Sequence, residues 1–316
     1  MTDIILHHYP ASPFSEKIRA ILGYKQLAWK SVHIPPVMPK PDLMPLTGGY
    51  RKTPVLQIGA DIYCDTSLMA RALERMKPAP SLYPPGLEAS AMLHAEWADH
   101  ELFFLAVPIV FQPAGLAHVM KVLPSDAMPK FQKDREALFA GGSGRRPSGP
   151  MSKSQLPFWL STLDAQLAGR TFLLGDAASI ADFATYHPLW FIRSNPGVAG
   201  TLDPYRNLVA WYDRMSAFGH GQSESMTGAE ALEVARNSKP QDVDSGDMPD
   251  PNGLKIGDAV VVGATDYGTD PVMGELVKSS LNEVAVRRSD EPVGEVVVHF
   301  PRLGFKVMGA KGKSHG

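Results

Sequence analysis

The period of the hydrophobic pattern changes along this 316-residue chain, and this change is the strongest constraint on its fold. Up to about residue 78, short β-branched runs alternate with helical patterns. From Leu87 to Phe218 apolar residues recur with the 3.6-residue period of helices, and beyond Gly253 they recur every second residue, as in strands. We therefore expect three differently built parts, which also suits a length of about 100–200 residues per domain.

The first part predicts an α/β arrangement. Ser12 is a good helix N-cap, Pro13 suits the first helical position, and Gly23 is a natural stop. The expected order is a strand at 3–8, a helix at 13–22, a strand at 29–34, a proline-rich loop at 35–49, a hairpin at 54–64 and a helix that begins near Asp65 or Thr66.

The second part predicts a helical domain. Glycine and proline mark a loop between helices at 141–150. Ser179 and Asp182 form a capping box, in which Asp182 replaces the usual Glu or Gln. The segment that follows, IADFATYHPLWFI, is apolar almost all round, so we expect it at the buried centre of the helical part, where its cap contributes stability and not catalysis.

The third part begins after an acidic connection. Residues 221–252 carry seven acidic and two basic side chains, with one short helical signal at the Thr227…Glu230 capping box. Beyond Gly253 the strands predict a small all-β, barrel-like domain. The domain boundaries that we expect are 1–78, 86–219, 220–252 for the linker and 253–310.

Composition narrows the class of protein. The chain is 44% hydrophobic and 20% charged with a net charge of −2, which is typical of a globular protein and not of a disordered or membrane-spanning one. No run of five like charges occurs, so neither a nucleic acid nor an anionic membrane is an expected partner. Cys64 is the only cysteine, which excludes an internal disulfide, and we found no three-ligand metal pattern. We expect a cytoplasmic protein.

The motifs together resemble the glutathione transferase superfamily, in its serine-type, bacterial-like form. They are ASPFSEKIRAIL after the first strand, then RKTPVL, YCDTSLMARAL and, in the helical part, SIADF. The resemblance covers about residues 1–218 and implies a thioredoxin-like domain followed by the all-helical domain. It also implies glutathione as co-substrate, a small hydrophobic electrophile as second substrate, and a homodimer. The β part after residue 253 departs from this two-domain plan.

The resemblance places Ser12 where serine-type members activate the sulfur of glutathione. A thiolate is the nucleophile, a free thiol titrates near ~8.5, and a helix N-terminus with a hydroxyl donor stabilises the anion. Tyr9 is the alternative hydroxyl, and a helix cap is the alternative role for Ser12. Cys64 ends a predicted strand, and we interpret it as a buried packing residue.

The resemblance also implies a set of glutathione-binding residues. Thr53 precedes a cis-proline, so that its backbone pairs with the cysteinyl part of glutathione, and an acidic residue with a hydroxyl neighbour holds the γ-glutamyl end. A lysine, here Lys52, holds the glycyl carboxylate, and Arg51 could share or take that role. The alternative is that both residues are solvated surface charges. The set is Lys52, Thr53, Pro54, Asp65 and Thr66.

For the electrophile pocket we expect Tyr9, Phe14, Trp97 and His100. His94, Trp97 and His100 recur every three residues of one helical pattern and share a broad face, although plain packing explains them equally well. The leading hypothesis is an enzyme that adds the glutathione thiolate to an electrophile, and conjugation, dehalogenation, isomerisation and peroxide reduction all remain open. The alternative is a non-catalytic scaffold whose β domain binds a partner.

Overall fold

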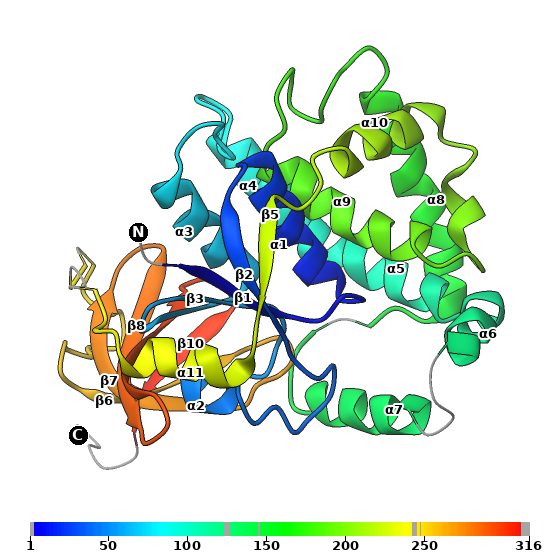
Figure 1. Cartoon of the computed structure of the whole chain (residues 1–316). Coiled ribbons are helices and arrows are strands. Elements are labelled where there is room, and N and C mark those ends of the chain that lie inside the picture. The colour runs from blue at the N-terminus through cyan, green and yellow to red at the C-terminus, as the bar shows by residue number, and fades with distance from the viewer. Residues whose placement is uncertain (1–2, 123–126, 145, 242–244, 247, 311–316) are drawn as a thin grey trace.

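The computed structural model describes residues 3–122, 127–144, 146–241, 245–246 and 248–310. Its centre is one ten-stranded sheet, in the order β10-β6-β7-β8-β9-β4-β3-β1-β2-β5. Figure 1 shows the helical part on one side of the amino-terminal strands and the carboxy-terminal strands on the other. The three kinds of structure expected from the sequence are confirmed, whereas the joining of the amino-terminal and carboxy-terminal strands in one sheet was not anticipated.

The amino-terminal part has the βαβ, loop, ββα order that the sequence predicts. The first strand pairs in parallel with the second and antiparallel with the third, which in turn pairs with the fourth. The bounds are β1 Ile4–His8, α1 Pro13–Tyr24, β2 Ala28–His33, α2 Met44–Thr47, β3 Val55–Ile58, β4 Asp61–Cys64 and α3 Thr66–Met76.

The helical part packs against α1. A core cluster of apolar side chains joins Ile18 and Ile21 of α1 to the helices of the second part, so the two parts share one interior. Its elements are α4 Glu88–Trp97, a π-helical turn η1 Ala98–Leu102, α5 Phe103–Val110, α6 Pro113–Val122, α7 Ala127–Leu138, α8 Gly149–Gln166, α9 Ile180–Arg193, the 3₁₀ turn η2 Ala199–Leu202 and α10 Arg206–Ser216.

The predicted capping box is present at the start of α9, and α9 is buried as expected. The carboxylate of Asp182 accepts hydrogen bonds from the backbone N–H and hydroxyl of Ser179, at 2.9 and 3.0 Å. It also accepts from the N–H of Leu173 and from the indole N–H of Trp211, at 2.8 and 2.9 Å. Four donors at one buried carboxylate fix the start of α9 against two other segments of the domain.

Part of the segment expected to be an acidic linker forms a strand of the sheet. Residues Gln222–Met226 form β5, which pairs in parallel with β2 and covers that edge of the sheet. The predicted Thr227–Glu230 capping box then opens α11, Gly228–Arg236. An exposed, polar strand was not recognisable from hydrophobic alternation, because β5 has almost no buried face.

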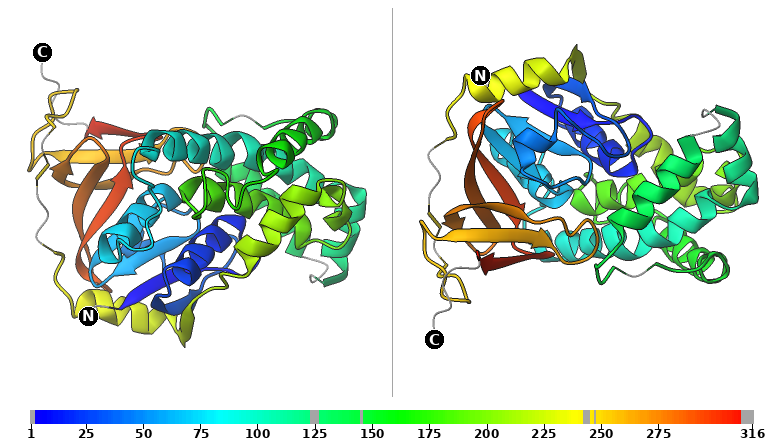
Figure 2. Two further views of the ribbon diagram at one scale, coloured as in Figure 1. Left: turned by 90° about the horizontal axis from the view of Figure 1, so that it is seen from above. Right: turned by 90° about the horizontal axis from the view of Figure 1, so that it is seen from below.

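The carboxy-terminal strands extend the amino-terminal sheet. They are β6 Ala259–Ala264, β7 Val272–Ser279, β8 Glu283–Asp290, β9 Gly294–Pro301 and β10 Phe305–Gly309. Strand β9 pairs in parallel with β4, and Figure 2 shows these strands curving around the face of the sheet opposite α1.

A second core fills the space between the first strands and these late ones. It includes Ile5 of β1, Val55 of β3, and Val298 and Phe300 of β9. Both faces of β1, β3 and β4 are therefore buried, one by helices and one by strands. All residues of these short strands are buried, so buried and exposed positions do not alternate along them. This is expected of a sheet covered on both sides.

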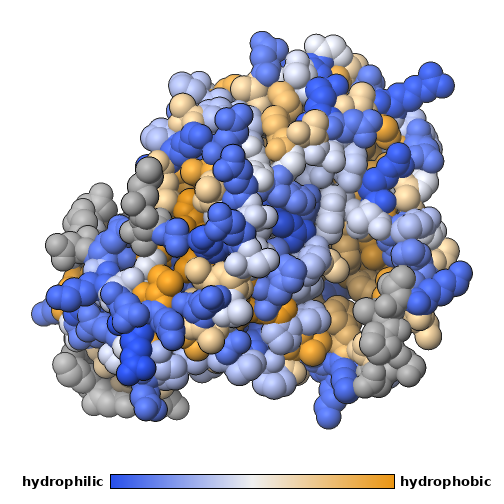
Figure 3. Space-filling view, viewed as in Figure 1, coloured by the Kyte–Doolittle hydropathy of each residue, from blue (hydrophilic) through white to orange (hydrophobic). Residues whose placement is uncertain are grey.

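The surface seen in Figure 3 is mostly hydrophilic with small scattered apolar areas. Among the described residues, no single helix is long and apolar enough to cross a membrane. One bent pair, Glu88–Val110 with Pro113–Lys121, meets the length and composition limits only when its two members are taken together.

Candidate functional site

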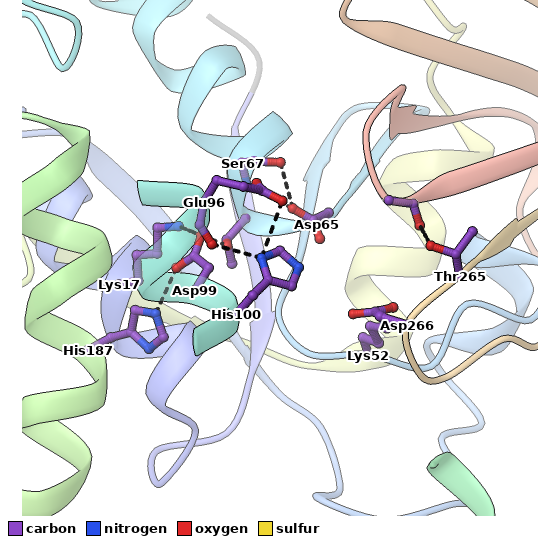
Figure 4. A network of polar contacts seen from close by, with 12 residues as sticks. Lys17, Lys52, Asp65, Ser67, Glu96, Asp99, His100, His187, Thr265 and Asp266 are labelled. Carbon is purple, nitrogen blue, oxygen red and sulfur yellow. Dashed lines mark hydrogen bonds and ion pairs between the residues drawn. The ribbon is translucent and has the colours of Figure 1, made fainter. Parts of the chain in front are cut away.

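A cavity of about 500 Å³ lies where the start of α3, the end of α4 and the carboxy-terminal strands meet. Its size falls in the range of small-molecule sites. Five residues of the predicted glutathione set line it, and Figure 4 shows several of its polar side chains. The five are Lys52, Thr53, Pro54, Asp65 and Thr66.

Thr53 and Pro54 form one wall of the cavity. Their peptide bond is cis, in agreement with the resemblance. The hydroxyl of Thr53 accepts a hydrogen bond from the amine of Lys40 at 2.7 Å, and the same amine donates to the carbonyl of Arg51 at 2.8 Å. Burial, helped by the charge of Arg135 and opposed by that of Asp134, lowers the pKa of Lys40 to about 7. Sequence reasoning missed Lys40, because it lies in the proline-rich loop.

Asp65 has an unusual backbone conformation in the cavity wall. Its φ of +74° lies in the left-handed region, which a residue other than glycine seldom adopts. Its carboxylate caps α3 by accepting from the N–H of Ser67 at 2.9 Å and from the Ser67 hydroxyl at 2.7 Å. Such strain is typical of functional sites, and here it keeps a carboxylate at a helix N-terminus beside the cavity.

Thr66 connects the cavity to a buried ionic network. The amine of Lys17, in α1, donates to the Thr66 hydroxyl at 3.2 Å and to the carboxylate of Asp99 at 2.5 Å. The other oxygen of Asp99 lies 2.9 Å from Nε2 of His187. Figure 4 shows how Asp99 lies between the two.

The charges of this network determine its protonation. Burial by itself would raise the pKa of Asp99, but the charge of Lys17 and the His187 hydrogen bond outweigh it and hold the pKa at about 2. Burial lowers the pKa of His187 in spite of the carboxylate. The π-helical turn Ala98–Leu102 places Asp99 and His100 on the cavity side of the helix, and such turns are frequent at functional sites.

One feature of the sequence indicates this network, namely the position of Lys17. Lys17 lies three residues after Phe14 and four before Ile21, on the apolar side of the helical pattern. A lysine at such a position is buried only with a partner. Its partner Asp99 is 82 residues away in sequence, and no local pattern connects the two.

Lys52 is engaged by the carboxy-terminal part of the chain. Its amine lies 2.6 Å from the carboxylate of Asp266 and 4.0 Å from the centre of the Tyr267 ring. Both residues belong to the β6–β7 loop and line the cavity. Arg51, the alternative to Lys52, pairs instead with Asp134 of α7 and is not among the residues that line the cavity.

Ser12 caps α1, as one interpretation of the sequence had it. Its hydroxyl accepts from the N–H of Ser15 at 3.2 Å, and its side chain is buried. Burial raises the pKa of Tyr9, while Arg135 and a hydrogen bond with Ser12 partly offset this. The two candidate hydroxyls thus lie together, and neither is among the described residues that line the cavity.

The predicted electrophile residues divide into two groups. Phe14 and His100 line the cavity, and His100 pairs with Glu96 at 3.3 Å. Trp97 does not line it and packs against Trp159, with ring centres 4.7 Å apart. His94 hydrogen-bonds Thr185 at 2.9 Å, so the packing alternative describes these two better.

Cys64 is fully buried in the second core, where burial raises the pKa of its thiol well above the usual value. The interpretation of Cys64 as a packing residue is confirmed. In the part of the chain that the structure describes, no group of three or more His, Cys, Asp or Glu side chains is arranged to hold a metal ion.

Comparisons with known proteins agree with this architecture. Residues 6–81 match the glutathione S-transferase N-terminal domain, and residues 144–218 match the glutathione S-transferase C-terminal domain. The chain is 46% identical to a GST-like protein from Pseudomonas syringae, with a TM-score of 0.82, over 97% of this chain and 100% of that one. The chain therefore belongs to the glutathione transferase superfamily, and its carboxy-terminal β region lies within the aligned length.

More distant structures share the fold alone. A glutathione S-transferase from Rhodospirillum rubrum F11 is 18% identical, with a TM-score of 0.51 over 68% of this chain and 88% of that chain. The beta-etherase LigF from Sphingobium sp. strain SYK-6 is 17% identical, with a TM-score of 0.50 over 69% of this chain and 96% of that chain. No curated protein matches the sequence.

Proposed function

We propose that this protein binds reduced glutathione in the cavity and presents its thiolate to a small hydrophobic electrophile. The observation that carries the proposal is the strained Asp65 carboxylate at the N-terminus of α3, beside the Thr66 hydroxyl and across the cavity wall from Thr53 and Pro54. In this arrangement Asp65 balances the γ-glutamyl ammonium, and the α3 N-terminus with Thr66 holds the γ-glutamyl carboxylate.

The thiol end of glutathione would lie toward the start of α1. The Ser12 oxygen caps the Ser15 N–H, and Ser12 also hydrogen-bonds Tyr9, so a thiolate that accepts the O–H of Ser12 would replace Tyr9 as its partner. Tyr9 lies close enough to share or exchange this role. Each unit by which the site lowers the thiol pKa requires ~1.4 kcal/mol of preferential stabilisation, which a hydroxyl donor and a helix end can supply.

Titration calorimetry with reduced glutathione tests binding, and the ultraviolet absorbance of the thiolate tests activation. We expect wild type to bind at micromolar to millimolar concentration and to show bound thiolate. Ser12→Ala keeps binding and loses thiolate absorbance, whereas Tyr9→Phe retains it. Ser161→Ala, an exposed serine on α8, is the matched control. Absence of glutathione binding to wild type contradicts the proposal.

The alternative remains a non-catalytic protein in which the fold serves as a scaffold and the β region binds a partner. The observation on its side is the burial of Ser12 off the cavity wall, because catalysis requires the ligand thiol to reach that hydroxyl. Binding of glutathione without thiolate formation, and without turnover of an aryl halide electrophile, would support the scaffold. We also propose a cytoplasmic location and the domain boundaries given above. The protein is further proposed to form a homodimer, which sedimentation at several concentrations tests.

A further inference from the structure

The resemblance implies that Lys52 binds the glycyl carboxylate of glutathione. In the structure Lys52 is already paired with a carboxylate of the β6–β7 loop, that of Asp266. The amine of Lys52 is 2.6 Å from Asp266 and stands over the ring of Tyr267 at 4.0 Å. The Lys52 and Asp266 side chains are 10% and 20% exposed. An ion pair so little exposed is only weakly screened by salt. A ligand carboxylate at this end of the cavity therefore meets a cation that already has an anionic partner.

The loop is held in this position independently of the ion pair. The backbone carbonyls of Thr265 and Asp266 accept hydrogen bonds from Ser143 and Gly144, at 3.0 and 2.8 Å. The N–H of Gly268 donates to the carbonyl of Leu138 at 2.6 Å. The ring of Tyr267 also packs against Phe139, with centres 4.8 Å apart. Because the helical domain anchors the loop on both sides of Tyr267, withdrawal of Asp266 requires breaking these contacts as well.

The other two cations of the cavity make their contacts away from Asp266 and Tyr267. Lys17 is paired with Asp99, whereas Arg71 keeps its charge and lies over the Tyr83 ring at 5.2 Å, beside Met92 of α4. The lining contains four acidic and three basic residues, so with His100 neutral its net charge is −1, and with His100 protonated it is zero. Glutathione carries a net charge of about −1 near neutral pH, from two carboxylates and one ammonium. The cavity has no excess positive charge to offset the second carboxylate.

We propose that Asp266 makes this site selective for γ-glutamyl-cysteinyl thiols whose carboxyl end is amidated. The proposal rests on the proposed function, since it assumes that the γ-glutamyl end lies at Asp65 and Thr66. A terminal amide carries no charge to compete with Asp266 for Lys52, and its N–H groups can donate to the Asp266 carboxylate. A terminal carboxylate faces Asp266 as a like charge, which disfavours it.

The test compares glutathione with its analogue in which the glycyl carboxylate is a carboxamide, by titration calorimetry of the full-length protein. We expect wild type to bind the carboxamide at least about tenfold more tightly than glutathione. In Asp266→Asn, Lys52 is left without an anionic partner, and the preference reverses toward glutathione. Glu275→Gln is the matched control, because it removes a carboxylate of the same β region at an exposed pair with Arg287.

The outcomes separate this inference from the proposed function. If wild type binds glutathione as tightly as the carboxamide or more tightly, the selectivity is overturned while glutathione binding stands. If neither thiol binds wild type or Asp266→Asn, the proposed function fails. The comparison of the two ligands on wild type needs no variant, so it decides whether the site has this selectivity even if Asp266→Asn does not fold. A preference that Asp266→Asn leaves unchanged assigns the selectivity to another residue and contradicts the role of Asp266.

Discussion

His299 of β9 and Asp61 of β4 join strands from opposite ends of the chain, with Nε2 of the histidine 3.0 Å from a carboxylate oxygen of the aspartate. The other ring nitrogen of His299 lies 2.6 Å from Glu283 of β8, and the ring stacks on Tyr63 with centres 4.5 Å apart. The three polar side chains are buried. This contact fastens the late strands to the early sheet at the point where β9 meets β4.

The stability of this junction is expected to depend on pH. Burial alone lowers the pKa of His299, but Asp61 and Glu283 outweigh it and raise the pKa above the usual value. A raised histidine pKa contributes stability that is fully present below about pH 6.5, the unfolded value, and is lost as pH rises through the folded pKa.

Glu283 sets the lower end of the pH range in which this junction is most stable. Burial alone raises its pKa, but His299 and Lys278 outweigh it and hold the pKa at about 2. Its contribution is present above about pH 4.3 and is lost as pH falls through about 2. We expect His299→Gln to cost about 3 kcal/mol of unfolding free energy between these limits, and less as pH rises. Urea unfolding at several pH values measures this, and a cost independent of pH would contradict it.

Asp182→Ala is expected to destabilise the helical domain by about 3 kcal/mol, because it leaves buried donors of three residues without an acceptor. Those donors belong to Leu173, Ser179 and Trp211. Ser179→Ala, which removes only the hydroxyl, is expected to cost about 1 kcal/mol. Thermal or urea unfolding of both variants measures the difference, and equal losses would argue against the carboxylate as the centre of the cap.

Lys17→Met removes the cation that holds the pKa of Asp99 at about 2 and leaves a buried carboxylate with His187 alone. We expect a loss of about 3–5 kcal/mol, as for one partner of a buried pair. The double variant Lys17→Met/Asp99→Asn is expected to be more stable than Lys17→Met, because no buried charge is left unpaired. Additive losses in this double-mutant cycle would show that the two residues do not interact.

Asp65→Asn separates the charge of Asp65 from its structural role. Asparagine tolerates a positive φ and can cap α3 through its amide oxygen, so stability is expected to change by less than about 1 kcal/mol. Loss of the negative charge is expected to weaken glutathione binding by about tenfold, because the γ-glutamyl ammonium loses its counter-charge. Unfolding and calorimetry on the same sample measure both, and unchanged binding would remove Asp65 from the site.

Much of the architecture was predictable because local signals agree with the final structure. Ser12 with Pro13, and Thr227 with Glu230, mark helix starts that the structure has at those residues. The cavity wall at Thr53, Pro54, Asp65 and Thr66 was predictable for another reason: these residues lie in short motifs, each close to the end of a strand or helix.

What the sequence could not supply depends on contacts between distant segments. Lys17 meets Asp99, Lys52 meets Asp266 and Asp61 meets His299 across 82, 214 and 238 positions. Periodicity shows that a face is buried, but not which other segment buries it. The same limit explains β5, whose polar residues become a strand only because β2 offers an unpaired edge.

Strands β5 and β9 lie on the two outer edges of the early four-stranded sheet, and both come from the last third of the chain. During synthesis at about 5–20 residues per second, the ribosome completes the first domain well before either covering strand emerges. The β2 edge is therefore exposed until β5 is made, whereas the β4 edge and one apolar face are exposed until translation is nearly complete. Until then this edge and face are open to pairing with other chains, and the last-made strands end that exposure.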